Sequence, residues 1–207
     1  MGWRGAASHR RPRPAALAFA ALFLSLAARS ALAHPHVWID YQLTLKVDRG
    51  RIVAVHEEWS IDEYETTLIL RDIAGDRPVT ALTPADVAAL EKNAFSNLQN
   101  YGYFTHVTAG AATVAVGKVN DFAAHLAAGK LIYDFTVPLA AAADAKSAPV
   151  NVGIWDETYY VDVEPAAGKP IRFEGDGAAA CKATTYSDQA HPIYFGSVFP
   201  TAMRVTC

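Results

Sequence analysis

Hydrophobic and polar positions alternate along the chain from residue 37 onward. From Val37 to Asp48 the odd-numbered positions are apolar, and a second alternating run extends from Val53 to Asp62. A period of two residues is typical of strands with one buried face. The intervening Asp48-Arg49-Gly50 suits a three-residue hairpin loop with a left-handed glycine. The pattern therefore predicts a hairpin in which the residue numbers of cross-strand partners sum to 98. On its polar face, His36 would lie opposite Asp62, Asp40 opposite Glu58, and Gln42 opposite His56.

A change to helical periodicity follows the hairpin. The spacing Asp62-x-x-Glu65 is that of an N-cap and a carboxylate one turn later, which predicts a helix over 63–73. Thr83 as N-cap and Pro84 at the first position predict a second helix from 84 to about 101. We expect alanine-rich 140–146 and glycine-rich 175–180 to be loops. Further strands are expected at 103–109, 112–119, 131–138, 150–155, 159–164, 170–174 and 202–207.

These elements predict an α+β fold. The helices fall in one block between β-hairpins, so we expect an antiparallel β-sandwich-like domain with a two-helix insertion.

The first 33 residues have the three parts of a secretory signal peptide. Basic residues open the segment, an uncharged apolar run covers 15–28, and Ala31-Leu32-Ala33 is a small-x-small cleavage site. The apolar run is shorter than the roughly 20 residues that span a bilayer. We expect residues 1–33 to be removed, residues 34–207 to form a single periplasmic domain, and His34 to become the new N-terminus.

Removal of this segment makes the protein more acidic. The whole chain has 18 Lys and Arg against 21 Asp and Glu; the segment holds five Arg and no acid, so 13 basic residues and a net charge of −8 remain. An acidic surface argues against nucleic acid and anionic membranes as partners and is compatible with cations. The mature chain has no further apolar run that is long enough to span a membrane.

Two cysteines occur in the chain, Cys181 and Cys207. In an oxidising compartment an isolated pair favours a disulfide over a thiolate metal site. We expect a structural disulfide.

The mature terminus combines potential metal ligands. His34-Pro35-His36 supplies a free α-amine and two imidazoles, which suit zinc, nickel, cobalt or copper(II). Because Pro35 has no amide proton, a copper chelate through deprotonated backbone amides is excluded. The expected ligands are His34, His36, Asp62 and Glu58. Alternative ligands are Asp40, His56 and Asp156, of which Asp40 would orient an imidazole. A polar strand face that is merely solvated, with Asp62 acting as an N-cap, is the competing interpretation.

Other polar residues carry weaker signals. Asp156 and Glu157 lie at a turn between two strands and are candidate outer ligands, whereas we expect Tyr159 and Tyr160 to pack on the core. No spacing supports a functional role for His106, His125 and His191, which we interpret as ordinary surface or strand residues.

Several segments resemble a known bacterial family. They are His34–Asp40, Glu58-Trp59 with Asp62-Glu63, Asn97–Phe104, Tyr133–Pro138 and Thr158–Asp162. They are similar to the periplasmic family catalogued as domain of unknown function 1007, often labelled as the periplasmic component of an uncharacterised transport system. The resemblance covers nearly all of 34–207. Many members carry a calcium-type loop between the two helices, but residues 71–78 lack its alternating oxygen ligands, so no calcium site is expected here.

The resemblance implies a role in transition-metal transport, because genes of the family often lie beside nickel/cobalt-type permeases. We therefore expect a periplasmic metal-binding accessory protein whose partner is an inner-membrane metal permease, rather than an enzyme. One alternative is a copper-dependent oxidoreductase that uses His34 with His56 or His36. Another is a structural or interaction domain that binds no metal.

Overall fold

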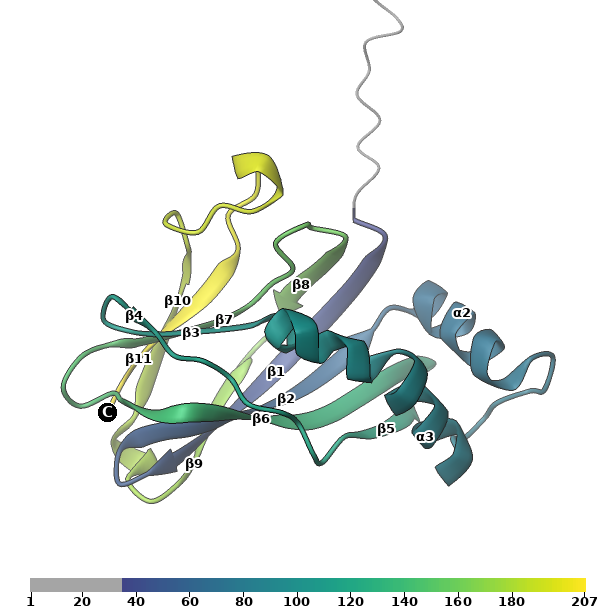
Figure 1. Cartoon of the computed structure of the whole chain (residues 1–207), viewed down its shortest axis with the longest axis horizontal. Coiled ribbons are helices and arrows are strands. Elements are labelled where there is room, and N and C mark those ends of the chain that lie inside the picture. The colour runs from purple at the N-terminus through teal and green to yellow at the C-terminus, as the bar shows by residue number, and fades with distance from the viewer. Residues whose placement is uncertain (1–34) are drawn as a thin grey trace, which may run out of the picture. The chain divides into compact units, whose positions relative to one another are not determined.

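The computed structural model describes residues 35–207, which form two β-sheets and a helical block (Figure 1). The expected signal peptide and His34 lie outside the described residues. Sheet A has the strand order β5-β6-β2-β1-β8, with β9 also paired to β1, and sheet B has the order β10-β11-β7-β3-β4. Strands β8 and β9 run parallel to β1 and all other pairs are antiparallel. The predicted α+β class is confirmed, with sheet A mixed.

The elements have the following bounds. Sheet A consists of β1 (Val37–Asp48), β2 (Arg51–Ile61), β5 (Ala123–Ala127), β6 (Lys130–Asp144), β8 (Val161–Pro165) and β9 (Ile171–Gly175). Sheet B consists of β3 (Thr105–Ala109), β4 (Ala112–Thr113), β7 (Val150–Ile154), β10 (Lys182–Ser187) and β11 (Thr201–Thr206). The helices are α2 (Glu63–Ala74), α3 (Pro84–Asn93) and the 3₁₀ segments η1 (Phe95–Phe104), η2 (Ala178–Ala180) and η3 (Tyr194–Gly196).

The inner face of sheet A carries the core. Its side chains form one cluster with residues of sheet B and of the helical block. Figure 1 shows the strands of sheet B on the left and the helices α2 and α3 on the right. Trp59 of β2 stacks on Phe104, and Phe135 of β6 meets Phe95 of η1 edge to face. Within residues 35–207 no helix is long and apolar enough to cross a membrane. The outer face of sheet A is left polar.

The β1–β2 hairpin forms, but the predicted register is wrong. Arg49 and Gly50 both have positive φ and make a two-residue turn, with Asp48 opposite Arg51. One extra residue, Val53, then enters β2 as a bulge between Lys46 and Val47 on the partner side. Turn and bulge together shift the partners by two residues while keeping the inward and outward faces. Asp40 therefore lies opposite Ser60, Gln42 opposite Glu58, and Thr44 opposite His56.

The long predicted helix is two elements. Thr83 caps α3 as expected, with a reciprocal capping box to Asp86, but the α-helix ends at Asn93. Ala94 departs from helical geometry and the chain continues as η1, which is itself interrupted near Gly102. Strands β5 and β10 were not predicted. The alanine-rich segment taken for a loop is strand through Asp144, because β2 supplies its hydrogen-bonding partners there.

The predicted disulfide between Cys181 and Cys207 is confirmed, across a sequence separation of 26. It joins the residue just before β10 to the residue just after β11, which pair antiparallel.

Replacing both cysteines with serine should lower the free energy of unfolding by about 3 kcal/mol, since the unfolded chain loses a cross-link. Urea denaturation followed by fluorescence measures this difference. Wild-type protein under reducing conditions is the control and should match the double variant. Equal stability of the oxidised wild type and the double variant would contradict the expected role.

Candidate functional site

His36 lies at one end of sheet A, immediately before β1. Its backbone N–H donates to the carbonyl of Tyr160 at 2.9 Å, and its ring stacks on the Tyr160 ring at a centroid distance of 4.8 Å. Tyr160 directly precedes β8, which pairs in parallel with β1. The first residues of the described chain are therefore held in place by β8. The Tyr160 ring is half-exposed beside the histidine, so the expectation that it packs on the core is wrong.

The parallel pairing brings carboxylates to this end of sheet A. Trp38 is the partner of Asp162, and Asp40 is the partner of Glu164. Because side chains alternate between faces, His36, Asp40, Asp162 and Glu164 share the outer face. We call these four residues and Tyr160 the His36 edge.

Asp162 and Glu164 are the carboxylates of this edge that were not identified as candidates from the sequence. Partial burial raises the pKa of Asp162, although a hydrogen bond from the Tyr159 hydroxyl at 3.4 Å acts in the opposite direction. Burial likewise raises the pKa of Glu164, which accepts a hydrogen bond from Thr201. Both carboxylates thus lie where a nearby cation would lower the cost of their charge.

Asp62 has a structural role at the start of α2. One carboxylate oxygen accepts the N–H groups of Tyr64 and Glu65, and the other accepts the N–H of Trp38. The N-cap that the sequence suggested is confirmed. These three bonds fix the β2–α2 junction to β1 on the side opposite β8, so the carboxylate is largely occupied by backbone donors.

Glu58 and His56 lie far from His36. Glu58 is opposite Gln42 and His56 is opposite Thr44, six and eight residues along β1 from His36. At about 3.3 Å per residue these offsets correspond to roughly 20 and 26 Å. One ion cannot bind His36 together with either residue. The structure therefore does not bring Glu58 and His56 to His36 as the predicted hairpin face did. The copper alternative, which pairs His34 with His56 or His36, involves a residue outside the described chain and stays a prediction.

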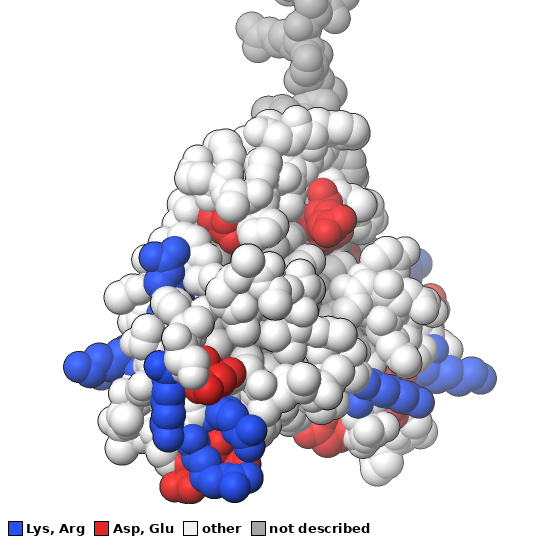
Figure 2. Space-filling view, turned by 60° about the vertical axis from the view of Figure 1, so that its left-hand side comes forward, with Lys and Arg blue, Asp and Glu red and all other residues white. Residues whose placement is uncertain are grey.

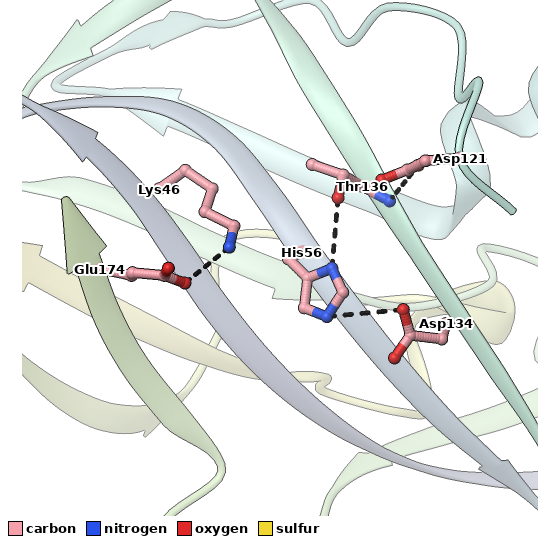
Figure 3. Close-up of polar contacts among 6 residues, drawn as sticks. All are labelled: Lys46, His56, Asp121, Asp134, Thr136 and Glu174. Carbon is pink, nitrogen blue, oxygen red and sulfur yellow. Dashed lines mark hydrogen bonds and ion pairs between the residues drawn. The ribbon is translucent and has the colours of Figure 1, made fainter. Parts of the chain in front are cut away.

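His56 belongs to a separate polar row on the outer face of sheet A (Figure 3). Its Nδ1 lies 3.2 Å from the Thr136 hydroxyl and its Nε2 lies 3.7 Å from Asp134. The Thr136 N–H donates to Asp121 at 2.8 Å. Thus both ring nitrogens of His56 have partners from β6.

Asp40 and Asp156 also have partners. Asp40 lies 3.6 Å from the Lys130 ammonium, an exposed pair that holds it weakly. Asp156 is buried and accepts hydrogen bonds from the Thr158 hydroxyl and from the backbone N–H groups of Thr158, Tyr160 and Val161. Its carboxylate organises the turn that presents Tyr160 to His36.

Among residues 35–207, no group of three His, Cys, Asp or Glu side chains is arranged to hold a metal ion. A metal site at the His36 edge therefore needs ligands from His34, which lies outside the described residues. The available donors are imidazole and carboxylate, the types that bind zinc and similar ions.

A second feature lies on the outer face of sheet B. A cleft of about 900 Å³ is lined by residues of β3, β7, β10 and β11 and by the loops beside them. His106 stacks on Trp155 at a centroid distance of 4.0 Å, and the His191 ring lies 6.0 Å from the Trp155 ring. His191 also pairs with the buried Asp188 at 2.8 Å. We interpreted both histidines as ordinary residues, but they line this cleft. The cleft could not be recognised from the sequence, because the four strands that form it are distant from one another along the chain.

The chain is similar to two uncharacterised bacterial proteins. It is 32% identical over 117 residues to an uncharacterised 15.5 kDa protein from the trpE 3′ region of Spirochaeta aurantia, covering 53% of this chain and 83% of that protein. It is 24% identical over 154 residues to an uncharacterised protein of Haemophilus influenzae, covering 73% of this chain and 71% of that protein. No solved structure matches. Residues 19–194 match the model of the family described as protein of unknown function (DUF1007), and the chain belongs to this family.

Proposed function

We propose that the mature protein is a periplasmic transition-metal-binding accessory protein that serves an inner-membrane metal transporter. The observation that carries the proposal is the position of His36. It is anchored at the start of β1, two residues from His34, on the same face as Asp162 and Asp40. Cleavage after Ala33 would add an amine and a second imidazole at that point. The disulfide supports an oxidising compartment.

The donor set fits a zinc-like ion. The His34 amine, the imidazoles of His34 and His36, and the carboxylate of Asp162 would supply four nitrogen and oxygen ligands, the number that zinc favours. Asp40 and Glu164, which lie further along β1 and β8, would add negative potential to the same face without contacting the ion. Asp62 is left to its structural role, since its oxygens already accept three backbone N–H groups.

Titration calorimetry of protein that begins at His34 tests the proposal with zinc, nickel, cobalt and copper. We expect one ion per chain with a Kd tighter than about 10 μM. His36→Ala and Asp162→Asn should each weaken binding by about tenfold or more, because each removes a ligand. His125→Ala is the matched control: this histidine is exposed on β5, away from the edge, and its loss should leave the Kd unchanged. Absence of binding in this range, or unchanged affinity in His36→Ala, would refute the proposal.

A further inference from the structure

The cleft on sheet B has a polar floor made from adjacent strands. Arg204 of β11 pairs with Asn151 of β7, which pairs with Thr108 of β3. The Asn151 amide donates to the Thr108 hydroxyl at 3.1 Å, and the Arg204 Nε donates to the Asn151 oxygen at 3.4 Å. These contacts fix the floor, and the exposed Arg204 side chain lines the cleft. Figure 2 brings the sheet B side of the molecule forward and shows mostly uncharged surface between its charged groups.

Aromatic rings lie beside this floor. In the next row of the sheet, Tyr186, Ala202, Gly153 and His106 are successive partners. A Cβ at Gly153 would lie 2.1 Å from the Trp155 ring, so glycine is what allows the indole to lie against the strand. The buried indole stacks on the half-buried His106 ring. The Arg204 guanidinium lies over the Tyr186 ring, 4.9 Å from its centroid.

His106 contributes a hydrogen-bond acceptor. Its Nε2 lies 3.1 Å from the Trp155 carbonyl, which can only accept, so Nε2 carries the proton. Burial lowers the pKa of His106, and the neutral ring then has a lone pair on Nδ1. The cleft thus combines a cation, planar apolar walls and an acceptor. Glu157 and Asp188 line it too and disfavour a second anionic group on a ligand.

We propose that this cleft binds a small planar aromatic monocarboxylate that carries an N–H or O–H donor. The carboxylate pairs with the Arg204 guanidinium, whose fork geometry suits it. The ring lies against the aromatic wall, and the donor faces the His106 acceptor. A cleft of this size is in the range of small-molecule sites. No residue of the His36 edge takes part, so the site is independent of metal binding.

Indole-2-carboxylate is a suitable probe, with indole-2-carboxamide as the uncharged analogue. Amide chemical shifts in a ¹H–¹⁵N spectrum of the mature protein report both the place and the strength of binding. We expect shifts at residues of β3, β7, β10 and β11, a Kd below about 1 mM, and at least tenfold weaker binding of the carboxamide.

Two variants distinguish specific binding in the cleft from non-specific binding to the surface. Arg204→Gln should weaken indole-2-carboxylate binding at least tenfold, and Asn151→Asp should do the same by placing a negative charge on the floor. Arg172→Gln, which removes an exposed arginine from sheet A, is the matched control and should have no effect. Equal affinity for acid and amide, shifts located elsewhere, no shifts at all, or unchanged binding in both floor variants would overturn the proposal.

Discussion

Glu57→Ala is expected to lower the free energy of unfolding by about 3 to 5 kcal/mol. Glu57 of β2 points into the core and is fully buried. Its carboxyl group lies 2.8 Å from the Trp59 indole nitrogen and 2.7 Å from the Thr105 hydroxyl. Truncation leaves the buried Trp59 indole N–H without this acceptor, reduces the Thr105 hydroxyl to its contact with the Tyr103 carbonyl, and opens a cavity between the sheets. Chemical denaturation of the variant and the wild type measures the loss.

Glu57→Gln is the matched control, and it should retain most of the stability. Burial raises the pKa of Glu57 to about 8, so the carboxyl group is neutral in the folded protein at pH 7. A protonated oxygen can donate to the Thr105 hydroxyl, which in turn lies 3.2 Å from the Tyr103 carbonyl. The glutamine amide reproduces this pattern. A loss in Glu57→Gln as large as in Glu57→Ala would contradict a neutral carboxyl group.

The raised pKa of Glu57 also sets the sign of a pH effect. The folded state holds the proton more tightly than the unfolded state, whose value lies near 4.5. The contribution of this group is therefore complete below pH 4.5 and declines as pH rises toward 8. Relative to Glu57→Gln, the wild type should become progressively less stable over that window. A stability difference that does not vary with pH would contradict the assignment.

An extension of two residues before His34 is expected to weaken transition-metal binding by about 100-fold or more, since the α-amine becomes a neutral peptide nitrogen, which is a poor ligand. Pro35 makes the loss severe, because its nitrogen has no proton to release in compensation. Calorimetry with zinc on the extended and native-start proteins gives the ratio. The same two residues added after Cys207 serve as the control. Equal affinity of the two N-terminal forms would exclude the amine as a ligand.

The alternating pattern of β1 predicted its strand, its faces and the hairpin, but not the register. The bulge at Val53 and the turn at Arg49-Gly50 each shift the pairing by one residue, and their combined effect preserves the hydrophobic pattern. Parity in the sequence therefore could not distinguish the two registers. Glu57 was not predicted to be buried for a related reason. Burial on this face was inferred from apolar residues, and a charged residue at position 57 interrupts that alternation.

The candidate sites were harder to predict because distant segments form them. His36 was identified from its place beside the predicted cleavage site, whereas Asp162 joins it only through the parallel pairing of β8 with β1. The cleft on sheet B depends on Gly153 and Arg204, whose roles follow from neighbours across the sheet. Local motifs such as the Asp62 cap and the Thr83 capping box were predictable, since each is completed within a few residues.

Native mass spectrometry of protein recovered from the periplasm, with equimolar zinc added, tests metal binding at a processed terminus most directly. The denatured mass reports where the mature chain begins, and the native mass reports the bound ion. We expect a chain that starts at His34, with an intact disulfide and one zinc ion retained. A chain that starts at any other residue, or one that starts at His34 and retains no ion, would contradict metal binding at a processed terminus.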